Sequence, residues 1–274
     1  MNYHTDTTAI TKSMLSTFYT SREDYWHQYI ACDVKRKPSK LMLAGSLAHA
    51  VLLEGHSVED SIAIYPPECL TKAGSLHPTK AGEFRAENEG KLCLKLEDAD
   101  EFFAMGDHLH KSELRVLFDG HHKETIFRGE HLGRKIKCKP DVCCVMDDHV
   151  VIYDLKFVQV ADPEQFKRGC RSFTYWMQDA HYSTVLRSNY GLPVTFRFCA
   201  VETSYPFRIN WYEYDARSRE IALEKWERVL KNFIECERTG VWQDNHVHTL
   251  TLSPYEVEAN EEGELEGCDE YSEV

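Results

Sequence analysis

The chain has 274 residues, of which 42% are hydrophobic and 12% aromatic, so it can bury a substantial core in one large domain or two small ones. No amino-terminal segment resembles a signal peptide, and no apolar run reaches the roughly 18 residues that span a bilayer. Ten cysteines without a signal segment indicate a reducing compartment rather than a disulfide scaffold. The composition therefore argues against secretion and membrane insertion and predicts a cytoplasmic protein.

The net charge of −13 is unevenly distributed. Residues 254–274 carry nine acidic residues and no basic one, which is typical of a solvated, disordered tail. We expect a single domain over residues 1–250 followed by this tail. Basic residues gather at 35–40 and at 134–139. Such clusters are usually solvent-exposed, and contact with phosphates is expected only if they lie next to a nucleic-acid site. The charge balance thus does not exclude a nucleic-acid partner.

Two short aromatic helices are predicted near the amino terminus. Thr11 or Ser13 can cap the first helix, and Ser21 can cap the second. Most of their aromatic side chains are expected in the core, whereas Ser13 and Arg22, near the helix starts, are candidates for holding a phosphate.

Residues 41–55 form an almost wholly apolar predicted helix, in which His49 is the polar side chain of consequence. A histidine among apolar neighbours is more often a satisfied core residue than a ligand. Neutral imidazole is nevertheless a common metal ligand, so both interpretations of His49 stay open at this point.

The signals are weaker between residues 56 and 130. TKAG occurs at 71–74 and again at 79–82, with His-Pro between the copies, which indicates a loop or lid. Helical spacing of leucine and aromatic residues predicts a helix over 91–118. Residues 123–138 then alternate apolar and polar side chains about a glycine-containing turn, which predicts two strands, with Glu124 on the first as a candidate acid.

Residues 133–156, GRKIKCKPDVCCVMDDHVVIYDLK, can be folded on paper into one hairpin. A turn at Asp147-Asp148 makes Asp141 face Asp154, and directly opposed residues on one face have Cβ atoms about 4.5–5.5 Å apart. Two such carboxylates can hold one divalent cation, and Lys156 shares the face of Asp154. The face with Asp141, Asp154 and Lys156 is called the chemical face, and the opposite face of the hairpin is expected to be apolar and to pack on the core.

An ordinary half-buried hairpin with outward charges is the alternative. Asp-Asp is a weaker turn signal than Asn-Gly, and Pro140 limits regular pairing near Asp141. Lys135, Lys137 and Lys139 would share the face of Asp141, which makes them candidates for phosphate contact.

A helix, two strands and a long helix are predicted after the hairpin. Ser172 or Thr174 can cap a helix that Gly191 ends, with Gln178 and Tyr182 on one face of it. Strands at about 194–203 and 207–214 and a helix over 216–238 complete the series. This order predicts an α/β (α+β) fold with a mixed central sheet flanked by helices.

The ordered motifs of the chain resemble the PD-(D/E)xK nuclease superfamily in its RecB-like branch. The residues that carry this resemblance are His49, Asp141, Asp154-Leu155-Lys156, Gln178 and Tyr182. The flanking segments YHTDTTAITKSML, GSLAHAVLLEG, GRKIKCKPDVCCV, VVIYDLK and SYPF, with Gly240-Val241-Trp242, are similar to the nuclease domain of the RecE-like exonucleases. The similarity covers residues 3–245 and implies a restriction-endonuclease-like core.

The resemblance also implies an activity: a magnesium-dependent exodeoxyribonuclease, for which Mn²⁺ is also suitable. It would resect linear double-stranded DNA from 5′ ends, preparing single strands for a RecT-type annealing protein in recombination and repair, and it would form a homo-oligomeric ring. The implied metal ligands are His49, Asp141, Asp154 and the carbonyl of Leu155. The implied catalytic residues are Asp141, Asp154, Lys156 and, as a weaker match, Glu124, with Gln178 and Tyr182 supporting the site and the nucleic acid.

Other activities remain open on the sequence. The alternatives are a single-strand-specific or endonucleolytic enzyme of the same superfamily and an inactive DNA-binding module, although every ligand position is filled. Iron–sulfur relatives carry closely spaced cysteines after the Gln/Tyr helix, whereas this chain has only Cys199, Cys236 and Cys268 there, so no cluster is expected. No zinc site is expected either, because Cys143 and Cys144 are adjacent and point to opposite strand faces.

Overall fold

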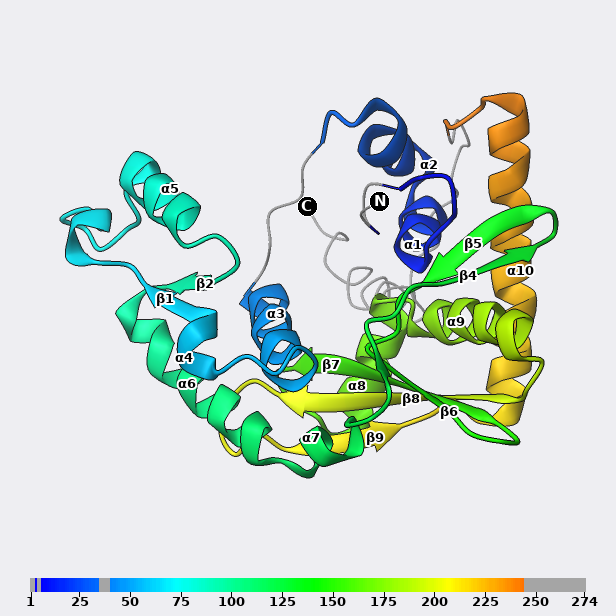
Figure 1. Cartoon of the computed structure of the whole chain (residues 1–274). Coiled ribbons are helices and arrows are strands. Elements are labelled where there is room, and N and C mark those ends of the chain that lie inside the picture. Colours follow the sequence, from blue (N-terminus) through cyan, green and yellow to red (C-terminus); the bar gives the residue numbers. More distant parts are fainter. Residues whose placement is uncertain (1–2, 4–5, 35–39, 244–274) are drawn as a thin grey trace, which may run out of the picture. The chain divides into compact units, whose positions relative to one another are not determined.

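A five-stranded mixed sheet lies at the centre of the computed structural model, which describes residues 3, 6–34 and 40–243 (Figure 1). The strand order is β3-β6-β7-β8-β9, and neighbours are antiparallel except for the parallel pair β7 and β8. The strands of this sheet are β3 (His122–Lys123), β6 (Val142–Val145), β7 (Val150–Val158), β8 (Val194–Glu202) and β9 (Ile209–Tyr212). Two small sheets pair β1 (Ile62–Ile64) with β2 (Leu92–Leu94) and β4 (Phe127–His131) with β5 (Arg134–Cys138). The mixed sheet flanked by helices agrees with the predicted fold class.

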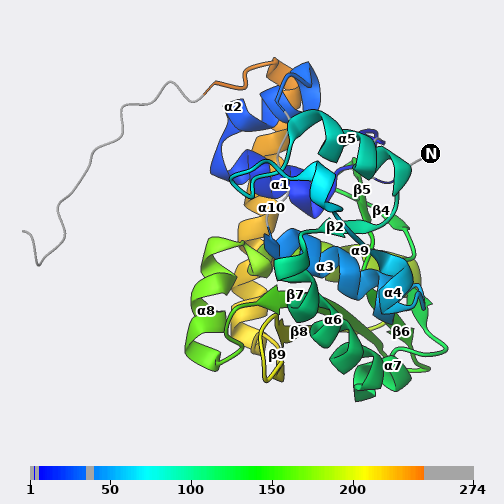
Figure 2. The same ribbon diagram turned by 90° about the vertical axis from the view of Figure 1, so that its left-hand side faces the viewer.

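Helices cover both faces of the central sheet (Figures 1 and 2). One face packs against α1 (Lys12–Thr20), α8 (Pro163–Ser172), α9 (Tyr175–Tyr190) and α10 (Ala216–Thr239). The other face packs against α3 (Lys40–Leu52), α4 (Val58–Ser61), α6 (Leu96–Lys111) and α7 (Glu113–Leu117). The remaining described helices are α2 (Arg22–Tyr25), the π-helix η1 (Trp26–Ala31), the 3-10 helix η2 (Pro67–Cys69) and α5 (Pro78–Glu87).

The hairpin of β6 and β7 has the predicted register. Val142 pairs with Tyr153 and Val145 with Val150, and the Met146 N–H donates to the His149 carbonyl at 2.9 Å. Successive side chains point to opposite faces, yet both faces are buried: Cys143 lies in the core beneath α9, and Cys144 lies in the core beneath α3 and α6. The prediction of one apolar and one chemical face is therefore wrong along β6, because helices cover the sheet on both sides.

The segment before Pro140 does not extend this hairpin. Instead β5 pairs with β4 across a turn at Leu132 and Gly133, which have φ values of 53° and 73°, so the predicted strands about a glycine-containing turn are confirmed. Pro140 has no N–H to donate to a ladder, and it separates β5 from β6. Glu124 lies just after β3 rather than within a strand, with a φ of 46°.

The predicted helix ends follow the capping residues. The Thr11 Oγ1 accepts a hydrogen bond from the Met14 N–H at 3.2 Å, and the Ser21 Oγ accepts one from the Asp24 N–H at 3.0 Å. Gly191 ends α9 in the left-handed conformation, with a φ of 67°, which glycine adopts without steric cost. Thr174 occupies the N-cap position of α9, but its side chain makes no capping hydrogen bond.

Two predictions for residues 56–130 are confirmed only in part. The helix expected over 91–118 is present as α6 and α7, and the first TKAG copy lies in a turn, but the start of the one and the second copy of the other differ. Residues 92–94 form a strand, β2, because its three residues pair in parallel with β1, and a strand this short leaves no distinct periodicity in the sequence. The second TKAG copy lies in the helix α5, which begins at Pro78 after the N-cap His77. Proline at the first helical position is a recognised helix start, so a signal for α5 was present.

Lys137 is buried rather than part of a basic surface. Its ammonium donates to the Tyr3 carbonyl at 2.8 Å and to the Asp6 carbonyl at 2.5 Å, and it lies 3.3 Å from the Asp6 carboxylate. The backbone of Ile10 bridges to Ile136 beside it. Phosphate contact by Lys137 is therefore excluded, because the segment before α1 covers this face of β5.

His181 is a buried, neutral histidine in α9. Its Nε2–H donates to the Lys137 carbonyl at 3.0 Å, and its Nδ1 accepts from the Trp226 indole N–H at 3.2 Å, so one tautomer satisfies both partners. Burial lowers the pKa of His181 to about 4. The unfolded chain binds a proton near the ordinary pKa of about 6.5, so stability is fully present above that pH and falls as the pH drops toward 4.

We expect this histidine to contribute roughly 3 kcal/mol to the loss of unfolding free energy between pH 7 and pH 4. Urea unfolding of the wild type and of His181→Gln at both pH values measures the contribution, with the exposed His56→Gln as the matched control. An equal pH dependence in the wild type and His181→Gln would contradict the assignment.

The predicted acidic tail at 254–274 lies outside the described residues, and the single domain over 1–250 stays a prediction. None of the described helices is both long and apolar enough to cross a membrane.

Candidate functional site

Two carboxylates meet where β6 and β7 approach the helix α3. Asp141 directly precedes β6, and Asp154 lies within β7; their exposed fractions are 8% and 3%. The Asp141 Oδ2 accepts a hydrogen bond of 2.6 Å from the Leu155 N–H. This backbone contact fixes the orientation of Asp141 and leaves its Oδ1 directed toward His49, whose Nε2 is 3.6 Å away.

Asp154 is held by side chains from α9 and from its own strand. The Gln178 Nε2 donates to the Asp154 Oδ1 at 2.5 Å, and the Lys156 ammonium forms an ion pair with the Oδ2. That Oδ2 is buried, and the Lys156 ammonium is the cation that compensates its charge. A carboxylate oxygen has more than one lone pair, so the Oδ2 can accept a further ligand beside the ammonium.

Beside Asp141 lies a group of three residues suited to a metal ion. His49, Glu124 and Asp141 each offer a ligand atom, and these atoms lie within 4.8 Å of one another. The His49 Nδ1 is 3.1 Å from the Glu124 Oε1, which also accepts from the Lys139 ammonium at 2.8 Å. The helix α3 thus brings His49 to the site, where it faces carboxylates rather than apolar neighbours alone.

The ionisation of these groups reflects burial and mutual charge. Burial and the charge of Asp154 raise the pKa of Asp141 to about 6, against the opposing effect of His49 and Lys156. The hydrogen bond from His49, together with Lys139, lowers the pKa of Glu124 to about 2 although burial opposes this. Burial alone would lower the pKa of Lys156, but Asp154, with Tyr175 and Asp141, outweighs burial and raises it. The site is therefore an array of strongly interacting charges.

A polar hollow of about 520 Å³ adjoins Lys156. It is lined by residues of α1, β7 and α9, including the candidates Ser13, Gln178 and Tyr182. Lys12 also lines it, and burial lowers the pKa of Lys12 to about 8, with the charge of Lys156 acting in the same direction. Arg22 does not belong to this lining; its guanidinium lies over the Phe18 ring at 5.7 Å from the centroid.

Sequence reasoning missed Lys12, Tyr175 and the contact that Lys139 makes. Lys12 lies beside the candidate Ser13, and Lys139, a candidate for phosphate contact, instead donates to Glu124. Tyr175 places its ring 4.9 Å from the Lys156 ammonium. Its position one residue after Thr174, at the start of a helix facing β7, carried no separate signal.

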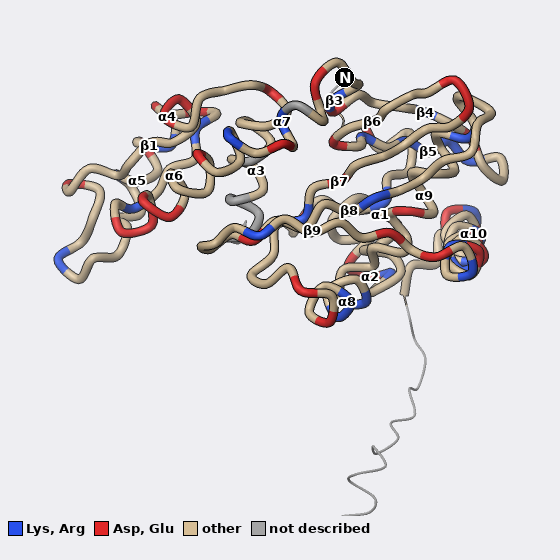
Figure 3. Tube along the Cα trace, turned by 90° about the horizontal axis from the view of Figure 1, so that it is seen from below, with Lys and Arg blue, Asp and Glu red and all other residues tan. Residues whose placement is uncertain are grey.

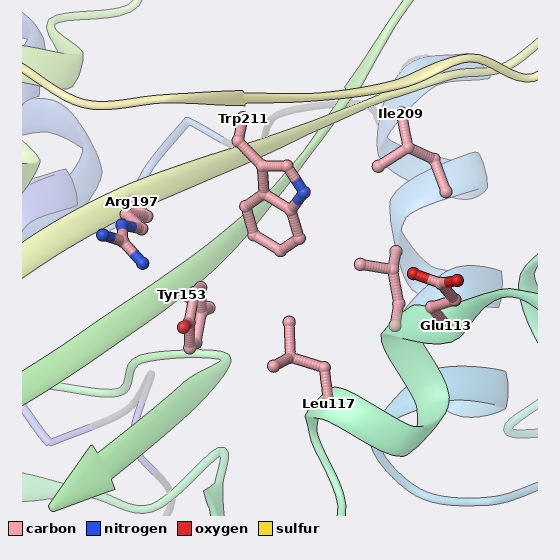
Figure 4. Close-up of a pocket in the computed structure, with 7 residues that line it drawn as sticks. Glu113, Leu117, Tyr153, Arg197, Ile209 and Trp211 are labelled. Carbon is pink, nitrogen blue, oxygen red and sulfur yellow. The ribbon is translucent and has the colours of Figure 1, made fainter. Parts of the chain in front are cut away.

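A larger hollow of about 900 Å³ lies away from this site (Figure 4). Tyr153, Trp211 and Leu117 point into it, and its lining is mostly apolar. None of the site residues discussed above lines it.

Comparison with known proteins agrees with the fold described above. A putative exonuclease from Eubacterium rectale has a solved structure that aligns with a TM-score of 0.60 at 18% identity, covering 94% of this chain and 96% of that one, which shows a shared fold. A second solved structure, SSO0001, aligns with a TM-score of 0.29 at 14% identity, over 69% of this chain and 84% of that one. No curated protein matches the chain. Residues 12–247 match a family described as a PDDEXK-like domain of unknown function (DUF3799), and the chain belongs to this family.

Proposed function

We propose that the protein is a metal-dependent nuclease that hydrolyses phosphodiester bonds of DNA. The observation that carries this proposal is the pairing of Asp141 and Asp154 from adjacent strand segments, with Lys156 against Asp154 and His49 beside Asp141. Buried carboxylates with an ammonium group next to them suit the binding of a cation and the stabilisation of a phosphate that gains negative charge.

The donor set fits Mg²⁺ or Mn²⁺. Hard carboxylate oxygens dominate it, and a single imidazole is present. The residues that would hold the ion are His49, Asp141, Asp154 and the carbonyl of Leu155. When bound, the ion supplies a bound water of lowered pKa and positive charge near the phosphate.

The backbone of Leu155 supports its place in this set. In an extended strand the N–H and C=O of one residue point to the same side, as the paired exchange of both bonds in antiparallel sheets shows. The Leu155 N–H points to Asp141, so its carbonyl is directed to the same side.

The chain's own groups would divide the remaining work. The Leu155 N–H and the Gln178 amide hold Asp141 and Asp154 in orientation. The Lys156 ammonium neutralises charge near the scissile phosphate. Glu124 orients His49 through the 3.1 Å contact and is itself held by Lys139. Tyr182 is buried at the wall of the polar hollow, so its role would be to support the site rather than to grip DNA from the surface.

The finer specificity that we propose is 5′-to-3′ digestion of linear double-stranded DNA. It would generate single strands for recombination or repair, with a RecT-type annealing protein as partner, a ring-shaped homo-oligomer as the working form and the cytoplasm as its location. The support for these details is the resemblance to RecE-like exonucleases, together with the name of the Eubacterium rectale protein as an exonuclease. A single-strand-specific or endonucleolytic activity uses the same residues and is the second candidate.

End-labelled DNA tests the proposal directly. A linear duplex labelled at its 5′ or 3′ end is digested beside closed circular and single-stranded DNA, with Mg²⁺, Mn²⁺ or EDTA. We expect metal-dependent early release of the 5′ label with the circle intact, and no cleavage in EDTA. Cleavage of the circle would instead establish an endonuclease, and no cleavage with either metal would contradict the nuclease proposal and favour a DNA-binding module.

A further inference from the structure

An exposed aromatic ring lies at the rim of the polar hollow beside Lys156. Phe173 joins α8 to α9, lines this hollow and is 58% exposed. Large apolar side chains are normally withdrawn from water, although single exposed ones are common. Its significance therefore depends on how the ring is held and on what surrounds it.

The backbone that presents Phe173 is fixed. Thr174 has a φ of 52°, which is unfavourable for a β-branched residue and persists only when its surroundings impose it. The Thr174 Oγ1 is 2.5 Å from the Ser16 Oγ and donates to the Phe173 carbonyl at 2.7 Å. The Lys12 ammonium donates to the same carbonyl at 3.0 Å. Contacts from α1 thus hold this turn in one conformation.

The Phe173 ring is the outer member of a stack that reaches the catalytic lysine. It stacks on Tyr175 with a centroid distance of 5.8 Å and an interplanar angle of 25°, and Tyr175 stacks on Phe198 at 5.4 Å and 22°. The Lys156 ammonium lies 4.9 Å from the Tyr175 centroid. Another flat ring placed on the exposed side of Phe173 would continue this stack next to the site.

Basic residues precede the exposed ring in the chain. The helix α8, which ends directly before Phe173, carries Lys167, Arg168 and Arg171 and a single acidic residue, Glu164 (Figure 3). None of the three basic side chains forms an ion pair within residues 6–34 and 40–243, where such contacts are described. Lysine and arginine beside an aromatic ring are typical of surfaces that bind single-stranded nucleic acid, with the bases on the rings and the phosphates on the cations.

We propose that Phe173 stacks on a nucleobase of the strand being cut, adjacent to the scissile phosphate at Lys156. This inference rests on the proposed nuclease function and names a base-binding position within it. Because every base has a flat π face, the contact is tolerant of sequence. It requires the base to leave its neighbours, as happens at a fraying duplex end or in a single strand.

Binding to DNA that lacks one base tests the stacking. The affinity of the wild type for a linear duplex is measured by fluorescence anisotropy in EDTA and at fixed salt, with the label at one end of the DNA. In a series of such duplexes, a single abasic site is placed one nucleotide further from the unlabelled end each time. We expect one position at which the abasic site weakens binding about 5- to 100-fold. Phe173→Ala and Phe173→Leu should bind intact DNA with the weakened affinity and ignore the abasic site, whereas Phe173→Trp should retain both.

A matched control is Trp211→Ala, which removes an aromatic ring of 41% exposure from the apolar hollow and should behave as the wild type. If Phe173→Ala binds DNA as tightly as the wild type and is equally sensitive to the abasic site, the inference is wrong. Cleavage by the wild type would in that case still support the proposed function. A wild type that neither binds nor cleaves DNA would overturn both.

Discussion

Lys156→Ala should lower the rate of DNA cleavage by about 10²–10⁴-fold and leave DNA affinity within a few-fold of the wild type. The ammonium contacts the Asp154 carboxylate and lies over the Tyr175 ring, so its removal takes away the cation paired with Asp154 without disturbing the basic residues of α8. Initial rates on linear duplex DNA in Mg²⁺, with affinity measured separately in EDTA, provide the comparison.

Two further variants separate loss of charge from loss of packing. Lys156→Met keeps an unbranched stem against Tyr175 but carries no charge, and it should be as inactive as Lys156→Ala. Lys231→Ala removes an exposed lysine from α10 and should retain full activity. Persistent cleavage by a clean preparation of either Lys156 variant would remove this lysine from the mechanism.

Asp6→Ala should cause the largest loss of stability among the substitutions considered. The Lys137 side chain is fully buried, and the change deprives its ammonium of the carboxylate 3.3 Å away while the two carbonyl contacts remain. Leaving a buried charge without its partner typically costs about 3–5 kcal/mol. Urea unfolding at neutral pH measures the change in unfolding free energy.

The double variant Asp6→Ala/Lys137→Met provides the internal control. Replacing both members of a buried ion pair with apolar groups is often close to neutral, so the part of the loss that comes from Lys137 should return, whereas the contacts of Asp6 with Thr8 and Arg128 stay lost. The exposed Asp100→Ala should change the unfolding free energy little. A double variant no more stable than Asp6→Ala would show that the buried charge of Lys137 is not the cause.

The features that the sequence predicted correctly are local. The register of β6 and β7 follows from alternation about a single turn, and Thr11, Ser21 and Gly191 mark helix ends through contacts within one or two turns of themselves. The mixed sheet follows from the order of such elements. Gln178 and Tyr182 share a helix face because their spacing requires it.

The features that it did not predict depend on segments far apart in the chain. Alternation placed Lys137 on an outer face, but the amino-terminal segment covers that face and supplies Asp6 as its partner. Both sides of β6 are buried because helices distant in sequence pack on each of them. The order of the motifs and their resemblance to a known family indicated His49, Asp141, Asp154 and Lys156 as site residues. The contact between Glu124 and His49 could not be predicted, because these residues are 75 positions apart in the chain.

Because β6 and β7 are buried on both faces, the effect of a destabilising substitution on the site depends on which helix layer it loosens. His49 reaches the carboxylates from the layer of α3, whereas Gln178 reaches Asp154 from the opposite layer of α9. If the packing of one helix layer loosens, the site loses the side chain that this layer supplies and keeps the side chain from the other layer. Two substitutions far apart in the fold could therefore abolish the proposed activity to the same extent but leave different contacts intact. A substitution that loosens α3 would leave Gln178 bound to Asp154, and one that loosens α9 would leave His49 opposite Asp141.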